Sequence, residues 1–334
     1  MSTPSIALIP SGYKEGLLYS QLPINGDGDL DFARTTIANR VNEQGVNEEM
    51  AVNMPRLDYS EGGCPVLLLE PSRKNLFLNS EVGVTQSITV VSGVDYAVSF
   101  SGNGSITFSG GASGTLNGTG STATDRVSQI VTTSSTSVTC TISGTVEYVN
   151  FEINTDDSSV VVSTSWIETN GTIETRAKDI STKTGLQNYI NSSEGTFYFY
   201  GKALADSSNT RYISLSDNSN NNFIQIRISN SNVLQVRTFK GGGGLESISS
   251  TSTNTLNYYK CAIVWDDTKL AFFVNGIKIQ EKSVDNSYPI NTLDTLTFNN
   301  GFVVGGSNYE GKVKEFEVYT TAYTDSEAID LTTI

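Results

Sequence analysis

Oxygen-bearing side chains alternate along the sequence NGDGDLDF, where they could act together as ligands for a cation. They are Asn25, Asp27, Asp29 and Asp31, and carboxylate and amide oxygens are the ligands that calcium prefers. An EF-hand loop, however, requires glycine at its sixth position and glutamate at its twelfth. Leu30 and Thr36 occupy these two positions. We therefore interpret the segment as a polar turn.

Asp266 and Asp267 follow a predicted strand and present the same choice between a calcium site and a turn. Aspartate is frequent in turns because its side chain accepts hydrogen bonds from the backbone two residues on. We favour a hairpin turn here. The sequence thus predicts no metal site and no cofactor, and calcium at these two loops stays the open alternative.

The chain lacks the residue patterns on which most hydrolytic chemistry depends. It has no histidine, which excludes Ser-His-Asp and Cys-His catalysis and zinc sites built from imidazole. Its 35 Asp and Glu residues offer many carboxylate pairs, but no spacing singles out a pair for glycoside hydrolysis. The run of glycines at residues 241–244 lacks the Lys-Ser/Thr of a phosphate-binding loop. We predict that the protein is not an enzyme.

The loop DNSNNN, residues 217–222, could instead donate and accept hydrogen bonds with sugar hydroxyls. Our candidate carbohydrate-binding residues are Asp217, Asn218, Asn220 and Asn222. Binding residues tend to lie on loops that a rigid scaffold holds in place. The alternative is a loop whose polar side chains are simply solvated.

Charge and hydropathy exclude further classes of protein. With 21 Lys and Arg against 35 Asp and Glu, the formal net charge of the 334 residues is −14, which argues against binding to nucleic acid. No segment approaches the about 18 apolar residues of a membrane span, and we expect no secretory signal at the start. We interpret Cys64, Cys140 and Cys261 as buried free thiols of a protein made in a reducing cytosol.

The elements that must position these candidates are strands, because the composition is poor in helix formers and contains 30 Gly. We predict an all-β chain. Most prolines fall within residues 1–79, at positions 4, 10, 23, 55, 65 and 71. Proline has no backbone N–H, so this segment cannot supply central strands. We predict that residues 1–79 form an extended arm that docks on a partner surface.

Two β-sandwiches are expected after the arm. Within residues 80–179, segments such as 87–90, 96–100, 105–108 and 138–142 alternate polar and apolar residues, which predicts a small sandwich. Residues 180–334 alternate more clearly, with Tyr259, Cys261, Ile263 and Trp265 on one strand face. Asn275-Gly276 predicts a two-residue hairpin turn. We expect this C-terminal sandwich to fold alone.

The C-terminal motifs resemble those of laminin-G/concanavalin A-like domains. The motifs that carry this resemblance are TFYFY at 196–200, AIVWDD at 262–267, FVNG at 273–276, GKVKEF at 311–316 and YTTAYTDSE at 319–327. The resemblance implies a jelly-roll sandwich. Since this fold hosts lectins, enzymes and structural modules, it is not specific for one ligand.

The preceding segments resemble bacteriophage virion proteins that carry such a domain. They are ANRVN at 38–42, VNMPRLDY at 52–59, GCP at 63–65, LLLEP at 67–71 and SWIET at 165–169, followed by TRA at 175–177 and Asp179. Glu168 departs from the pattern, which often has proline there. The resemblance implies that residues of the first part anchor the protein to the virion, namely Arg40, Asn42, Pro55, Arg56, Leu57, Asp58 and Tyr59.

The sequence and the resemblance together predict a structural virion protein, a tail fibre, head fibre or capsid decoration protein. Its expected partners are other virion proteins, further copies of itself, most readily as a trimer, and glycans of the host surface. It would be made in the host bacterial cytoplasm and exposed on the particle, with no nucleic-acid partner and no membrane insertion. The alternative is a polysaccharide depolymerase on the same scaffold.

Overall fold

The structure, a computed structural model, describes residues 2–155, 160–205, 209–241, 243–301 and 307–334. The chain forms two compact units. Unit 1 consists of Met1–Ala33, Val66–Leu69 and Ile180–Ile334, and unit 2 of Arg34–Pro65 and Glu70–Asp179. The chain therefore leaves unit 1 twice and returns to it twice.

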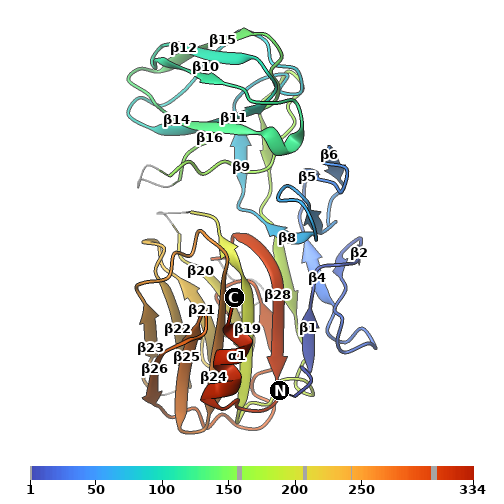
Figure 1. Ribbon diagram of the computed structural model, residues 1–334, viewed down its shortest axis with the longest axis vertical. Coiled ribbons are helices and arrows are strands. Elements are labelled where there is room, and N and C mark those ends of the chain that lie inside the picture. The colour runs from blue at the N-terminus through green and yellow to red at the C-terminus, as the bar shows by residue number, and fades with distance from the viewer. Residues whose placement is uncertain (1, 156–159, 206–208, 242, 302–306) are drawn as a thin grey trace. The chain divides into compact units, whose positions relative to one another are not determined.

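Unit 1 is a sandwich of two antiparallel sheets (Figure 1). Within unit 1, sheet A has the order β26-β25-β24-β19-β28-β8, and β1 also pairs with β28. Its strands are β1 (Ile6–Leu8), β8 (Val66–Leu69), β19 (Gly195–Ala203), β24 (Tyr259–Asp266), β25 (Lys269–Val274), β26 (Ile277–Ser283) and β28 (Gly311–Tyr319).

Among the described residues, sheet B of unit 1 has the order β2-β3-β4-β18-β27-β20-β21-β22-β23. They are β2 (Tyr13–Lys14), β3 (Leu17–Leu18), β4 (Leu30–Ala33), β18 (Ile180–Lys183), β20 (Arg211–Ser216), β21 (Phe223–Ile228), β22 (Leu234–Phe239), β23 (Glu246–Ser250) and β27 (Thr295–Thr297). The described residues are thus almost entirely strands and connections, which confirms the all-β prediction.

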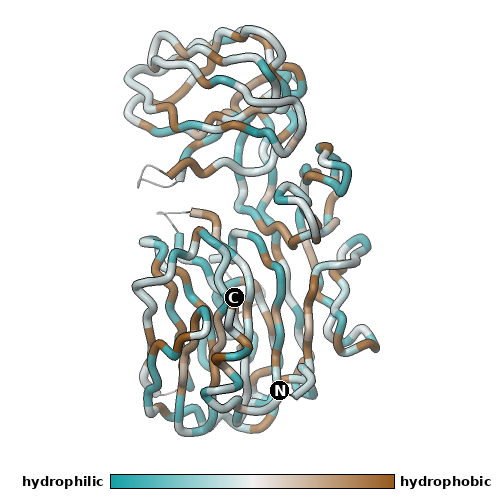
Figure 2. The backbone as a smooth tube through the Cα atoms, viewed as in Figure 1, coloured by the Kyte–Doolittle hydropathy of each residue, from teal (hydrophilic) through white to brown (hydrophobic). Residues whose placement is uncertain are grey.

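Both faces of β24 are buried. The face with Cys261 and Trp265 points into the sandwich, as the alternation predicts. The opposite face, with Ala262 and Val264, is covered by the C-terminal helix α1 (Asp325–Thr332). Elsewhere in unit 1, apolar and polar residues are interspersed along the backbone (Figure 2).

The turn between β25 and β26 has the predicted form. Asn275 and Gly276 have φ of 48° and 76°, and a type I′ turn needs positive φ at both positions. Val274 pairs with Ile277 across this turn.

Residues 1–79, expected as an extended arm, take a different form in the structure. Ile6–Leu8 pairs with residues 316–318 of β28, and Val66–Leu69 pairs with residues 311–313 along the same edge of β28, opposite β19. Both are short apolar strands that end near prolines, Pro4 and Pro10 for the first, Pro65 and Pro71 for the second. Proline limits the length of these strands without excluding them from a sheet, so patchy hydrophobicity here reflects short strands.

Unit 2 contains the small β-sandwich expected within residues 80–179. One sheet has the order β10-β15-β12-β13 and the other β14-β11-β16; their apolar faces share one core that includes Phe100, Val138 and Phe151. The strands are β10 (Gln86–Thr89), β11 (Asp95–Ser101), β12 (Ser105–Gly110), β13 (Gly114–Asn117), β14 (Val127–Thr132), β15 (Ser137–Ser143) and β16 (Glu147–Ile153).

Further short elements complete unit 2. β5 (Ala38–Val41) pairs with β6 (Asn47–Met50), and β9 (Arg73–Asn75) pairs with β17 (Glu174–Arg176). The others are β7 (Arg56–Asp58) and a 3₁₀ turn, η1 (Ala123–Asp125). No helix in the described part of the chain has the length and apolar character needed to cross a bilayer.

Candidate functional site

A groove of about 340 Å³ lies on sheet B, over strands β20, β21 and β22. Its lining residues come from these strands and from the adjoining loops: Tyr212, Asn220, Phe223, Gln225, Arg237, Phe239, Leu245 and Asn300. The pairing register explains their meeting, since Phe223 is opposite Phe239 and Gln225 is opposite Arg237. Side chains opposite one another on antiparallel strands share a face. We call this hollow the sheet B groove.

Two phenylalanines form an aromatic surface in the sheet B groove. The rings of Phe223 and Phe239 are stacked, with their centroids 5.8 Å apart. The guanidinium carbon of Arg237 lies 5.9 Å from the centroid of Phe223, within the range of a cation–π contact. The groove thus combines an apolar platform with a cation at its side.

Arg237 is half-buried, and burial lowers its pKa. The nearby Tyr212 side chain acts in the opposite direction, and the charge of Arg227 adds to the lowering. An arginine remains protonated at neutral pH under such shifts. Arg237 therefore presents a partly desolvated cation, which attracts an anionic or strongly polar group more than a fully hydrated one does.

Asn300 supplies an unsatisfied acceptor to the groove. Its main-chain oxygen accepts a hydrogen bond from Gln225 Nε2 at 3.0 Å, but its side-chain Oδ1 is buried with no hydrogen-bond partner among the described residues. A buried acceptor without a partner costs free energy.

The predicted sugar-binding loop borders this groove, but its residues have different roles. The Asp217 carboxylate accepts hydrogen bonds from Ser219 and from Asn222 Nδ2, at 2.7 Å for the latter. Asn222 Oδ1 in turn accepts from the N–H of Gly241 at 3.0 Å. Asn218 has a positive φ of 56° and shapes the turn. Of the four candidates, the structure brings only Asn220 to the lining of the groove.

Sequence reasoning missed Tyr212, Arg237 and the two phenylalanines. The alternation in the sequence could have indicated them. Where Ile224, Ile226 and Ile228 occupy one face of a strand, the polar and aromatic residues between them occupy the other face. A second, larger hollow of about 720 Å³ shares Phe239 with the groove. Charged residues along it are paired, as in the Lys240–Asp285 ion pair at 2.9 Å. Gly243 and Gly244 line it, whereas Gly242 of the predicted glycine run lies outside the described residues.

The carboxylates of the expected polar turns accept hydrogen bonds from other residues of the chain. Asp27 accepts hydrogen bonds from Asn25 and from the Tyr189 hydroxyl, and Asp29 accepts from the N–H of Ser20. Asp266 accepts from the N–H of Thr268, as in a turn. Within the described ranges, no group of three or more His, Cys, Asp or Glu residues could hold a metal ion.

All three cysteines are free thiols, and two of them are buried. Burial raises the pKa of Cys140 to about 12 and also raises that of Cys261. Cys64 is exposed, so the interpretation of all three as buried is wrong for this residue. It lies in the loop between β7 and β8, where neighbouring glycines leave it uncovered.

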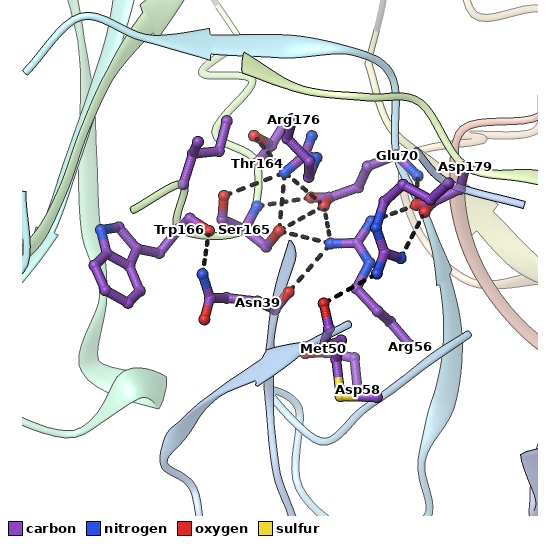
Figure 3. Close-up of polar contacts among 12 residues, drawn as sticks. Asn39, Met50, Arg56, Asp58, Glu70, Thr164, Ser165, Trp166, Arg176 and Asp179 are labelled. Atoms are coloured by element: carbon purple, nitrogen blue, oxygen red, sulfur yellow. Dashed lines mark hydrogen bonds and ion pairs between the residues drawn. The ribbon is translucent and has the colours of Figure 1, made fainter. Parts of the chain in front are cut away.

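One expected anchoring residue, Arg56, lies at the centre of a buried ionic cluster in unit 2 (Figure 3). Its guanidinium pairs with Glu70 at 2.6 Å and with Asp179. Arg34 pairs with the same aspartate at 3.2 Å, and Arg176 with the same glutamate at 2.9 Å. Ser165 donates to Glu70 from its N–H and its hydroxyl, at 2.7 and 2.6 Å.

The cluster is charged despite its burial. Burial alone would raise the pKa of Glu70, but Arg176 and Arg56 outweigh this effect and hold the pKa well below its usual range. Burial likewise lowers the pKa of Arg56, whereas Asp179 and Glu70 more than compensate and raise it. Glu70 is thus kept ionised by the arginines that surround it.

The remaining expected anchoring residues also make contacts within unit 2. Arg40 donates to Glu48 and to the Leu57 carbonyl, at 2.8 and 2.9 Å, and Asn42 accepts from the N–H groups of Gln44 and Val46 in a turn. The other four lie on or beside β7: Pro55, Leu57 and Asp58 are buried, and the N–H of Tyr59 donates to Val41. These hydrogen bonds and buried side chains stabilise the part of unit 2 around β5 and β7.

Comparisons with known proteins address the C-terminal half of the chain. Residues 176–328 match a family described as the concanavalin A-like lectin/glucanases superfamily. No curated protein matches the chain.

Several solved structures resemble the chain at low identity. The CBM40 of a Ruminococcus gnavus IT-sialidase bound to α2,3-sialyllactose is 13% identical, with a TM-score of 0.37 over 42% of this chain and 83% of its own. A SAP-like pentraxin from Limulus polyphemus is 17% identical, with a TM-score of 0.36 over 42% of this chain and 70% of its own. Domain 4 of AbnA, an arabinanase from Geobacillus stearothermophilus, in complex with arabinotriose, is 12% identical. Its TM-score is 0.37 over 47% of this chain and 73% of its own.

The family match and the two-layer arrangement of sheets A and B agree on the fold of this region. The strands that carry the sheet B groove, β20 to β22, all lie inside the matched residues. Residues 176–328 form a concanavalin A-like domain.

Proposed function

We propose that the concanavalin A-like domain binds carbohydrate in the sheet B groove and that it does so without catalysis. The observation that carries this proposal is the juxtaposition, in one groove, of the stacked Phe223 and Phe239, the half-buried Arg237 and the unsatisfied Asn300 Oδ1. Ligand sites of this kind combine an apolar surface with a few convergent polar groups.

Each group matches a chemical feature of a sugar. The apolar C–H face of a pyranose ring packs on an aromatic surface, and its hydroxyls donate to acceptors such as Asn300 Oδ1. Arg237 donates to a hydroxyl or a carboxylate of the sugar. The volume of about 340 Å³ lies at the lower end of the range for ligand pockets and suits one or two sugar residues.

The test is a glycan array probed with the full chain and with two variants. Arg237→Gln should weaken binding at least tenfold, roughly the value of one charge-assisted hydrogen bond. Lys183→Gln is the control, because it removes one positive charge from β18 in the same sheet and does not line the groove. Equal loss in both variants, or no glycan bound by the wild-type chain, would exclude the groove as the site.

We further propose that the protein is a surface appendage of a bacteriophage particle. The resemblance of residues 38–71 and 165–179 to phage virion proteins supports this role, with other virion proteins and further copies of the chain, most readily as a trimer, as partners. Antibodies against the protein should label purified particles, and sedimentation of the full chain should give an oligomer. Release of reducing ends from host polysaccharide would instead support the depolymerase alternative.

A further inference from the structure

Within the described residues of strands β20 to β23, the face of sheet B that holds the groove carries two charged side chains, and both are arginines. Successive residues of a strand point to opposite faces, and the pairing register places Arg227 opposite Gln235 and Arg237 opposite Gln225. The other positions on this face of the four strands hold Ser, Gln, Tyr or Phe. In a chain with a formal net charge of −14, these strands therefore present a cationic face.

The two carboxylates that adjoin this face in the sequence have other partners. Glu246 of β23 is opposite Thr238, which is buried on the other face of sheet B, and its carboxylate pairs with Lys282 of β26 at 3.5 Å. Asp217, just after β20, accepts a hydrogen bond from Asn222 Nδ2 at 2.7 Å. Both carboxylates are thus bound away from the two arginines.

Neither arginine forms an ion pair within the described part of the chain. Arg227 donates from Nη1 to the neutral side chain of Gln235, and the guanidinium of Arg237 lies beside the ring of Phe223. The charge of Arg227 lowers the pKa of Arg237, as expected for like charges on neighbouring strands. An anion bound at Arg237 would offset this repulsion.

A guanidinium beside an aromatic surface suits a sugar that carries a carboxylate. Arginine presents a planar fork of donors that can bind both oxygens of a carboxylate, and such charge-assisted bonds are roughly twice as strong as neutral ones. The attraction is also stronger in a partly desolvated groove than in water. In an acidic sugar the carboxyl carbon is bonded to the ring, so a ring packed on Phe223 and Phe239 can bring the carboxylate beside Arg237.

We propose that the sheet B groove selects glycans whose sugars carry a carboxylate, an inference that rests on the function proposed above and narrows it to one class of ligand. Arg237 binds the carboxylate directly, because it lines the groove. Arg227 does not line the groove and strengthens binding through its charge. Phe223 and Phe239 contact the sugar ring and contribute equally to the binding of acidic and neutral sugars.

Binding of matched acidic and neutral glycans to the full chain tests this selectivity. The array carries oligosaccharides that contain glucuronate, galacturonate or sialic acid, each beside its neutral methyl ester. Calorimetry then gives the dissociation constants of the acid that binds most tightly and of its ester. We expect the acid to bind about tenfold more tightly than the ester, which is the value of one charge-assisted hydrogen bond. This preference should decrease as salt rises.

Substitutions at the two arginines separate direct contact from charge. Arg237→Gln should abolish the preference for the acid, whereas Arg237→Lys should retain part of it because the positive charge remains. Arg227→Gln should weaken binding of the acid about threefold and leave that of the ester unchanged. Lys183→Gln is the control for net charge, because it lies on β18 of the same sheet and outside the groove. It should change neither affinity.

Phe239→Ala distinguishes a failure of this inference from a failure of the proposed function. It should weaken binding of acid and ester alike, because it removes one of the two stacked rings. Equal affinity of the wild-type chain for acid and ester, with both lost in Phe239→Ala, would overturn the selectivity and leave carbohydrate binding in the groove intact. A preference for the acid that survives Arg237→Gln, or a stronger preference for sulfated glycans, would also overturn it. Binding of no glycan would exclude both proposals.

Discussion

Two buried glutamates of unit 2 have pKa values shifted in opposite directions by their surroundings. Glu70 contacts two arginines, and their charges hold its pKa below the usual range despite burial. Glu152 accepts hydrogen bonds from the N–H and hydroxyl of Thr164, both at 2.8 Å, but burial dominates and raises its pKa. Ionised Glu70 therefore stabilises unit 2, whereas ionised Glu152 costs free energy at neutral pH.

Replacement of these glutamates by glutamine should separate the two effects. Glu70→Gln leaves Arg56 and Arg176 without their shared carboxylate and should lower the free energy of unfolding by about 3–5 kcal/mol at neutral pH. Glu152→Gln keeps hydrogen-bonding groups at the same place and should change the free energy of unfolding by less than about 1 kcal/mol. Urea denaturation at pH 7 gives both values.

The pH dependence follows from the sign of the Glu70 shift. A carboxyl group with a lowered pKa in the folded state contributes stability that is present above its unfolded pKa, about 4.3. This contribution is lost as pH falls from there through the folded value. The difference in stability between wild type and Glu70→Gln should thus shrink below about pH 4. A constant difference down to pH 3 would contradict the role assigned to this carboxylate.

At the scale of single elements, α1 shows how a short helix is fixed on a sheet. The N–H of Glu327 donates to Thr324 Oγ1, and Glu327 Oε2 accepts from the N–H of Thr324 at 2.9 Å. This reciprocal capping box satisfies two N–H groups at the start of the helix. Ala328 is then buried against sheet A together with Tyr323, so the cap positions the apolar side of α1.

Removal of the cap should destabilise α1 by a predictable amount. Thr324→Ala should lower the free energy of unfolding of unit 1 by about 1 kcal/mol, because an N-terminal donor loses its acceptor. Thr320→Ala, at an exposed threonine before the helix, should change it by no more than about 0.5 kcal/mol. Equal effects of the two substitutions on the urea midpoint would show that the capping box contributes nothing to stability.

How far the sequence predicts each element depends on the range of its interactions. The faces of β24 and the turn at Asn275 and Gly276 follow from local alternation and from backbone conformation, and the prediction is confirmed there. The capping box of α1 is local as well, since it joins Thr324 to Glu327 three residues later. The groove could not be predicted, because Arg237 reaches Phe223 only through the register of β21 and β22.

At the scale of the whole molecule, the structure assigns distant segments to one sandwich. β1 and β8, from the first part of the chain, complete sheet A beside β28, and β4 pairs with β18 in sheet B. No local pattern shows these pairings, because they join residues far apart in sequence. The expectation that residues 180–334 fold alone therefore omits five strands of their own sandwich, β1, β2, β3, β4 and β8.

Two fragments test this division of the chain. Residues 180–334 alone should expose the edge of β28 and apolar side chains of both sheets, and should melt at a lower temperature than unit 1 in the full chain or aggregate. Residues 34–179, which contain all of unit 2, should fold cooperatively, with the ionic cluster complete. Calorimetry of both fragments and of the full chain gives the comparison. A fragment of residues 180–334 as stable as unit 1 would contradict the structural role of β1, β4 and β8.

The pairing of Ile6 with Val318 also determines the order in which the protein can fold during its synthesis. The ribosome releases β1 long before β28, the strand with which it pairs. Unit 2 can fold in the meantime, since its sequence is complete at Asp179. Until β28 has emerged, the apolar residues 6–8 and 66–69 lack their partner strand and are open to pairing with other chains. Strand exchange between molecules is therefore expected most often between nascent copies that are translated close together on one messenger RNA.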